Sequence, residues 1–350
     1  MTIGRVIDRP SPSPAAEPTA ARLRLGFLTH LHVGGDAADS YRIALELFET
    51  AEALGYDAGW VAQHHFGNGG GRLPSTLTFL AAAAQRTRRI QLGTAIVILP
   101  LEDPIRVAED AAVVDALSGG RLQLGLGTGG DPLTFAALGH DLATRRERYA
   151  ASLTRLQTAL AGAPINHTEA RLYPPAPTLT DRLWESTLSA ESGARIGRQG
   201  HGLLLARTAF MSSEPTDQAQ LPVAEAYRAA HAQHAHAARI GLSRAVYPAA
   251  DRATASAHLD SGVAAYVESM IQRGFFPAGL SREAYYARSH IHYGHPAEVI
   301  ASLQADLVLP HATELICQVH PGHPTPDQIV VALERIAHEV APALGWRTPA

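Results

Sequence analysis

The stretch IQLGTAIVILPLEDPIRVAEDAAVVDALSGGRLQLGLGTGG, residues 90–130, contains one complete strand–helix–strand unit. Its first apolar run, at 90–99, predicts a buried parallel strand, because such strands are short, apolar and non-alternating. Asp103 and Pro104 predict the start of a helix, and the SGGR segment after it predicts the end. A second apolar run follows at 122–126 and predicts the next strand.

The same rhythm of a short apolar run and a helical stretch recurs along the chain. Strands are expected at 23–28, 58–62, 90–99, 122–126, 183–188, 202–206, 240–247 and 314–319. Helical spacing of apolar residues fits 43–54, 75–86, 104–117, 145–160, 190–199, 296–307 and 326–340. Eight such units favour α/β architecture in the form of a single (β/α)₈ TIM barrel. The alternative, a doubly wound sheet, would carry a glycine fingerprint after its first strand, and residues 29–35 (THLHVGG) do not fit one.

Length and composition agree with one large globular domain at 22–350. The chain has 350 residues, of which 46% are hydrophobic and 18% charged, so a large core is expected. Residues 1–21 are rich in proline, serine and alanine and predict a disordered tail. The net charge of −4 gives no basic excess for nucleic acid or an anionic membrane surface. With a single cysteine, no membrane span and no cleavable leader, we expect a cytoplasmic protein.

Two segments are longer than simple connections between a strand and a helix. One includes residues 166–177, between the fourth and fifth strands, and the other spans about 251–293, between the seventh and eighth. Long excursions from the C-terminal ends of barrel strands usually shape an active site. We therefore expect long loops after strands 4 and 7 at the mouth of the barrel.

Three stretches at strand ends are candidates for chemistry. His64 and His65 follow the second strand, where imidazoles can transfer protons, although a packing pair is an open alternative. The glycine-rich residues 125–130 could approach a ligand closely. Residues 184–189 (WESTLS) precede a helix and indicate either an anion site or ordinary N-capping by Ser189.

The 18 histidines form no recognised metal-ligand pattern. His231 and His234 share a helix face, with His236 nearby, but no carboxylate completes a ligand set, so a solvated face is expected. Residues 290–295 include three histidines in a predicted loop. We therefore expect no metal site.

Several stretches together resemble the bacterial-luciferase-like flavin-dependent monooxygenase family. They are WVAQHHF at 60–66, GTAIVILPLEDPIRVAED at 93–110, DALSGGRLQLGLG at 115–127, Glu185-Ser186 with Ser189, and YGHPAEV at 293–299. The resemblance keeps the order of these motifs and extends over residues 23–345.

The resemblance implies a barrel that holds reduced FMN at its C-terminal mouth, supplied by a separate flavin reductase. Molecular oxygen would form a flavin peroxide that oxygenates a small, mostly apolar organic substrate. His64 would be the catalytic histidine, and Ala95 and Ile96 would flank a non-proline cis peptide bond against the flavin ring. Further cofactor-binding positions carried over from the family are Gly127, Thr128, Arg146 (or Arg148), Glu185, Ser186 and Ser189.

The chain also departs from the family's pattern. Gln63 stands where the family usually has Glu, Gly127 where luciferase has a reactive cysteine, and Thr128 where it has an arginine. Light emission is therefore not inferred. A deazaflavin-dependent hydride-transfer oxidoreductase, a non-catalytic flavin-binding protein and a metal hydrolase on the same barrel stay open as alternatives. Family members are often dimers, which allows a homodimer here.

Overall fold

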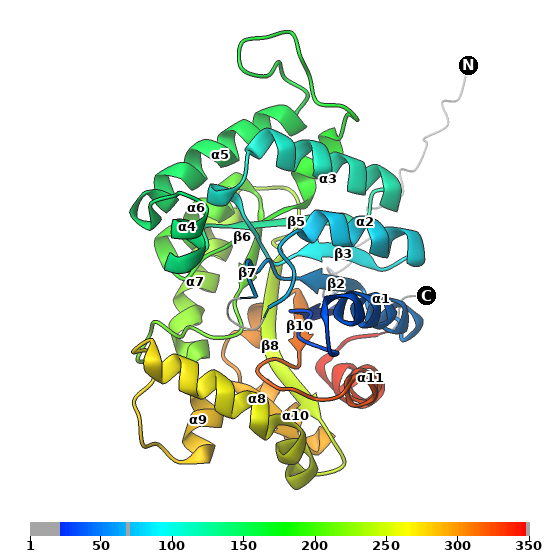
Figure 1. Ribbon diagram of the computed structural model, residues 1–350, viewed down its shortest axis with the longest axis vertical. Coiled ribbons are helices and arrows are strands. Elements are labelled where there is room, and N and C mark those ends of the chain that lie inside the picture. The colour runs from blue at the N-terminus through cyan, green and yellow to red at the C-terminus, as the bar shows by residue number, and fades with distance from the viewer. Residues whose placement is uncertain (1–21, 68–70, 348–350) are drawn as a thin grey trace, which may run out of the picture.

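The computed structural model describes residues 22–67 and 71–347, so the tail predicted at 1–21 lies outside the described residues. Eight parallel strands close into a barrel surrounded by helices, as the sequence predicts (Figure 1). Closure comes from β10, which pairs in parallel with both β8 and β1. The barrel strands, in order around it, are β1 (Arg24–Thr29), β2 (Ala58–Val61), β3 (Gln91–Thr94), β5 (Leu122–Gly127), β6 (Leu183–Ser186), β7 (Gly202–Leu205), β8 (Ile240–Pro248) and β10 (Glu314–Gln318).

The helices cover the outside of the barrel, and most begin at a residue whose side chain caps them. In the unit that opens at residue 90, the Asp103 carboxylate accepts from the backbone N–H groups of Ile105 and Arg106, and Gly119 ends the helix with a left-handed φ of 68°. The helices are α1 (Ala37–Ala53), α2 (Thr76–Arg86), α3 (Pro104–Ser118), α4 (Pro132–Ala137), α5 (Arg145–Leu160), α6 (Ala190–Gln199), α7 (Thr216–His231), α8 (Arg252–Gln272), α9 (Arg282–Arg288), α10 (Pro296–Gln304) and α11 (Pro326–Arg335).

Two tryptophans fill the inside of the barrel. Trp60 on β2 and Trp184 on β6 meet edge to face, with ring centroids 5.5 Å apart. A Cβ on Gly93 would lie 2.1 Å from the Trp60 ring, so glycine on β3 makes room for that indole. Each indole N–H also finds a partner, since Trp60 donates to Glu314 and Trp184 to Gln123. Strand alternation consequently turns the neighbour of each tryptophan outward, toward the helices.

The strand predicted at 90–99 is interrupted. It forms β3 and a short β4 (Val97–Ile98), and Leu99–Leu101 is a 3₁₀ turn. Where β3 leaves the sheet, the Thr94 hydroxyl donates to the Gly125 carbonyl and accepts from its N–H, both at 2.8 Å. The Thr94 side chain thus replaces backbone hydrogen bonds between β3 and β5 at this point. The apolar sequence of 90–99 does not indicate this interruption.

The first of the two long segments lies away from the mouth, whereas the second leaves the C-terminal end of β8 as predicted. Residues 166–177 follow α5 and lead back to the start of β6, so they lie at the N-terminal end of the barrel rather than at its mouth (the green loop beyond α5 in Figure 1). Residues 251–293 form α8, α9 and an additional strand, β9 (Ile291–Gly294), which pairs with the last part of β8. After the fourth barrel strand, the excursion at the mouth is instead the segment with α4.

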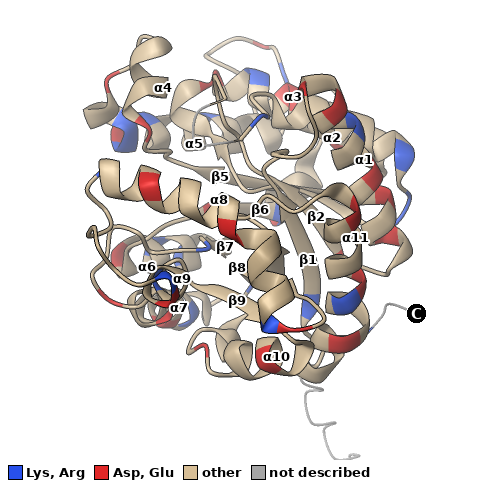
Figure 2. Ribbon diagram, turned by 60° about the horizontal axis from the view of Figure 1, so that its bottom comes forward, with Lys and Arg blue, Asp and Glu red and all other residues tan. Residues whose placement is uncertain are grey.

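The charged residues gather on the outer helices and loops (Figure 2). The exceptions on barrel strands are paired, as with Glu314 and Arg24, Glu185 and Arg195, and Arg244 and Asp306. Among the described residues, no helix combines the length and apolar character needed to cross a membrane.

Candidate active site at the mouth of the barrel

Four neighbouring strand ends bring most of the predicted site residues to one rim. His64 follows β2, Ala95 and Ile96 follow β3, Gly127 ends β5, and Ser186 ends β6. The parallel register places these ends side by side, since β2 pairs with β3, β4 pairs Ile98 with Gly127, and β5 pairs with β6. The prediction that His64, Ala95 and Ser186 share the C-terminal end of the barrel is confirmed.

Ala95 and Ile96 form a half-buried apolar surface at this rim. They pack on the inner cluster that contains Trp60 and Trp184, and the peptide bond between them is cis, as the resemblance implied. A Cβ on Gly127 would lie 2.2 Å from Cδ1 of Ile96, so glycine lets β5 approach this side chain closely. The result is an apolar surface in the mouth next to a glycine-rich edge.

His64 is the end of a chain of hydrogen bonds that runs into the barrel. Its Nε2 lies 3.0 Å from Nδ1 of His30, which follows β1. Nε2 of His30 lies 2.8 Å from Oε1 of Gln318 on β10. The amide of Gln318 then donates through Nε2 to the Ser243 hydroxyl on β8, at 2.6 Å.

This chain fixes the tautomers of both histidines. Gln318 presents its carbonyl oxygen to His30, so Nε2 of His30 must carry the proton. Burial lowers the pKa of His30 to about 3, which keeps the ring neutral and leaves Nδ1 as an acceptor. His64 must therefore donate from Nε2. Burial also lowers the pKa of His64, helped by the neighbouring His65, so the lone pair of the neutral ring stays on Nδ1.

His320, which follows β10, completes what we call the mouth cluster, His30, His64 and His320. Its ring lies 4.6 Å from that of His30, and burial holds its pKa well below the usual range. Tyr266 on α8 packs against the His320 ring, and the guanidinium of Arg207, after β7, lies 4.8 Å above Tyr266. The helix α8 therefore reaches the mouth.

The site residues indicated by the sequence do not include His30, His320, Gln318 or Arg207. All four lie at the end of a barrel strand or shortly after it, which is the same signal that identifies His64. His30 lies within the THLHVGG stretch at 29–35, directly after the first predicted strand, so its position is the signal that could identify it.

Gln63, where the family usually has Glu, serves as both donor and acceptor. Its Oε1 accepts from the N–H of Ile98, and its Nε2 donates to the Pro74 carbonyl and to Oε1 of Glu102, at 2.8 Å. A carboxylate could not donate these two bonds and would face Glu102. The amide therefore suits the pairing with Glu102 and ties the loop after β2 to β4.

The polar end of the rim lies at β6 and α6. The Ser189 hydroxyl accepts from the N–H of Ser192, so it caps α6, and Ser186 is half-buried. Arg146 is exposed on α5, whereas Arg148 reaches inward and donates from Nε and Nη2 to the Pro100 carbonyl. Arg148 is therefore closer to the rim structure than Arg146.

Glu185 is engaged elsewhere. Its buried carboxylate accepts from Tyr149, from both terminal nitrogens of Arg195 and from His201. Arg195 and His201 hold its pKa at about 2 against the opposing effect of burial. The cause is strand alternation, since Trp184 points into the barrel and Glu185 consequently points out. Glu185 ties β6 to α5 and α6, and its side chain leaves no oxygen for a cofactor in the mouth.

Two other groups of histidines differ from the sequence prediction. His231 is buried at 2% exposure, and the rings of His231, His234 and His236 lie within 5.2 Å of one another, so the solvated helix face is wrong for His231. His292 belongs to β9 rather than to a loop, His290 lies in the turn just before that strand, and His295 caps α10.

Comparison with known proteins identifies the family of this chain. The family model for luciferase-like monooxygenases matches residues 23–340. Among curated proteins, 4-hydroxyprotoasukamycin monooxygenase of Streptomyces nodosus subsp. asukaensis is 44% identical over 137 residues, which cover 39% of this chain and 37% of that protein. Enzymes named as F420-dependent are also among the similar proteins.

Two solved structures share the whole fold. The monooxygenase RslO1 from Streptomyces bottropensis gives a TM-score of 0.76 at 23% identity, over 91% of this chain and 99% of that one. The oxygenating constituent of 3,6-diketocamphane monooxygenase from Pseudomonas putida, in complex with FMN, gives 0.73 at 18% identity, over 94% and 100%. The chain matches the first curated relatives over only 37–66% of their own length.

Proposed function

Because the chain belongs to the luciferase-like monooxygenase family, we propose that it is an FMN-dependent, two-component monooxygenase acting on a small, mostly apolar organic substrate. The observation that carries the proposal is the order of groups along four adjacent strand ends. An imidazole at β2 is followed by an apolar surface at β3, a glycine-rich edge at β5, and hydroxyls at β6 and α6. This order suits a ligand with a flat apolar ring at one end and a phosphate at the other.

The residues present fit FMN on structural grounds. Ala95 and Ile96 offer a half-buried apolar surface, and Gly127, against which Ile96 packs, continues with Thr128 as a glycine-rich backbone edge. Ser186, Ser189 and the first N–H groups of α6 would hold the phosphate, since helix N-termini attract anions. Arg148 or Arg146 would add positive charge. Reduced FMN supplies the electrons that activate molecular oxygen.

The chain's own residues would orient the catalytic histidine, transfer a proton and exclude water from the mouth. His64 presents a lone pair at Nδ1 and can accept or return a proton there, while His30 and Gln318 hold its ring in one orientation. The helix α8, which brings Tyr266 against His320, would limit the access of water to the mouth.

Binding experiments test the cofactor. We expect the protein to bind FMN more tightly than riboflavin, and F420 weakly. Replacing Ser186 and Ser189 with Ala should lower FMN affinity at least about tenfold and leave riboflavin affinity unchanged, because hydrogen bonds to a charged group are worth about 1.5–3 kcal/mol. Ser281→Ala removes a comparable N-cap from α9 and serves as the matched control. Equal losses for both ligands would assign the two serines to the fold.

The same titration separates the alternatives. Preferential binding of F420 would favour a deazaflavin-dependent hydride-transfer oxidoreductase, for which the F420-dependent relatives are the supporting observation. Release of hydrogen peroxide from bound reduced FMN, without product from any substrate, would favour a non-catalytic flavin-binding protein.

The proposal includes a separate flavin reductase that delivers reduced FMN by diffusion in the cytoplasm. Activity should therefore persist when the reductase is held behind a dialysis membrane that only the flavin can cross. Activity that requires direct mixing of the two proteins would contradict this part of the proposal.

A further inference from the structure

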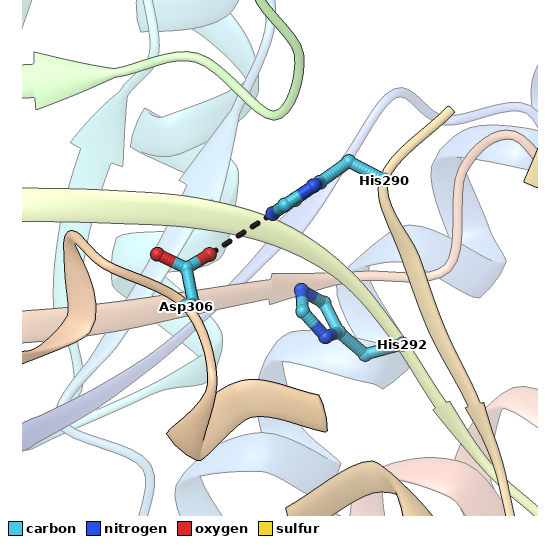
Figure 3. Close-up of side chains that lie close together, drawn as sticks. All are labelled: His290, His292 and Asp306. Carbon is cyan, nitrogen blue, oxygen red and sulfur yellow. Dashed lines mark hydrogen bonds and ion pairs between the residues drawn. The ribbon is translucent and has the colours of Figure 1, made fainter. Parts of the chain in front are cut away.

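Two histidines and an aspartate meet on the outer wall of the barrel. His290 lies in the turn before β9, His292 lies on β9, and Asp306 follows α10 (Figure 3). Each residue offers one donor atom, and these atoms all lie within 4.8 Å of one another. We call these three residues the wall cluster. Asp306 lies 14 positions after His292 and 16 positions after His290, so the three residues form no short sequence motif.

His292 brings a nitrogen with no partner. The residue is 4% exposed, its Nδ1 lies 2.8 Å from the Ser302 hydroxyl, and its Nε2 is buried without a hydrogen-bond partner. Buried polar atoms are nearly always paired, so this one calls for a ligand. When Nδ1 donates to Ser302, Nε2 carries the lone pair, which is the form that binds a metal ion.

Asp306 is held in place and still has capacity for a cation. Arg244, 0% exposed, donates Nε to Oδ2 at 2.6 Å, and the N–H of Val308 donates to Oδ1. The remaining acceptor position of Oδ2 faces Nε2 of His290, 2.9 Å away. Two ligands of a tetrahedral ion lie roughly 3.3 Å apart, so an ion can replace the proton shared by His290 and Asp306 after modest rotation of the rings.

The cluster is reachable and has compensating charge. A cavity of about 240 Å³, lined by His290, His292, Asp306 and Asp217 among others, opens beside it. The charge of Arg244 is already paired with Asp306, so the Asp217 carboxylate supplies further negative charge for an incoming ion. Water in the cavity can complete the coordination.

We propose that the wall cluster binds one divalent transition-metal ion of the zinc type, through Nε2 of His290, Nε2 of His292 and a carboxylate oxygen of Asp306. Two imidazoles and one carboxylate select Zn²⁺, Co²⁺ or Ni²⁺ over Mg²⁺ and Ca²⁺, which prefer all-oxygen sites. Ser302 would orient His292, and Arg244 would orient Asp306. The site is separate from the mouth, so its existence does not depend on the proposed function.

The first test uses the full chain after removal of metal with a chelator. Titration with Co²⁺ should give one tightly bound equivalent with the visible absorption of a low-coordinate ion, and Zn²⁺ should displace it and raise the melting temperature. Mg²⁺ should do neither. Absence of that equivalent in the wild-type protein overturns the proposal, whatever the variants do.

Variants then locate the ion. His292→Gln and His290→Gln should each weaken binding by more than the roughly 10–100-fold typical of losing an outer-shell partner, whereas Ser302→Ala should fall within that range. His290→Gln can still donate to Asp306, so the metal-free protein should melt as the wild type does. The control is the double variant His234→Gln, His236→Gln, which alters the histidine group near α7 and should keep the bound ion. Loss of the ion in the control, or retention in both single variants, contradicts the proposed ligands.

Discussion

The mouth cluster and the wall cluster use the same side chain for different chemistry. In the mouth, His30 and His64 are linked in series and end on neutral groups, the amide of Gln318 and the hydroxyl of Ser243. On the wall, His290 forms a hydrogen bond with the buried carboxylate of Asp306, and Nε2 of His292 has no hydrogen-bond partner. A series that ends on neutral donors and acceptors fixes where protons lie. A pair of rings beside a carboxylate suits a cation.

One strand anchors both clusters. Ser243 and Arg244 are consecutive on β8, and strand alternation sends them to opposite faces of the barrel wall. Ser243 meets Gln318 on the inside, and Arg244 meets Asp306 on the outside. The two histidine groups thus differ in the residue that supports them, Ser243 in the mouth and Arg244 on the wall. Which of the two faces a group depends on the side of β8 on which that group lies.

The largest effect is expected for His64→Ala. If the mouth cluster transfers protons, oxygenation should fall by about 10²–10⁴-fold, the usual contribution of a general acid or base, while FMN affinity is retained. Product and hydrogen peroxide should be measured together, since unused reducing equivalents should appear as peroxide. His65→Ala is the matched control, because His65 is the adjacent histidine outside the hydrogen-bonded chain. Normal product yield in His64→Ala would remove the catalytic role.

Arg244→Met breaks the wall cluster. Removing one member of a buried ion pair typically costs 3–5 kcal/mol, so the free energy of unfolding should fall by about that amount in a denaturant titration. Arg282→Met, which removes an exposed pair with Asp260, should cost about 1 kcal/mol or less. Equal effects of the two substitutions would show that Arg244 does not hold the wall carboxylate.

Gln318→Leu sharpens the comparison from the mouth side. The substitution leaves the Ser243 hydroxyl and Nε2 of His30 without their partner, at a cost of about 1–3 kcal/mol in stability. Histidine-selective ¹⁵N NMR should show His64 protonated at Nε2 in the wild type and as a mixture of tautomers in the variant. A single Nδ1-protonated form in the wild type would contradict the deduced chain of donors.

The smallest expected effect concerns pH. Burial lowers the pKa of His64, so its ring should stay neutral as the pH falls through 6.5, and the acid limb of the rate profile should lie below that value. Gln318→Glu places a carboxylate at His30, which favours charged imidazole and should move the limb upward by about one pH unit or less. A wild-type limb above pH 6.5, or a downward shift in the variant, would refute this account.

The sequence predicted what depends on strand order and missed what depends on three-dimensional neighbours. Residues that follow apolar runs, such as His64 and Ser186, could be assigned to the mouth because all parallel strands end there. The family resemblance implies that Glu185 binds phosphate, but Trp184 beside it points into the barrel, so strand alternation turns the Glu185 carboxylate outward. The strand IHYG at β9 carries too little apolar sequence to be recognised, and its contact with Asp306 exists only after α10 has folded back.

The loop at 166–177 lies at the N-terminal end of the barrel, opposite the mouth. A fusion made there should leave the strand ends undisturbed, which makes the loop a natural insertion point for a reporter or an affinity handle. A reductase fused at the same point would release reduced flavin on the wrong side, a full barrel height from the opening. Under the proposed function, channelling in an engineered single-chain enzyme would instead require an attachment near α4 or α8, on the side of the mouth.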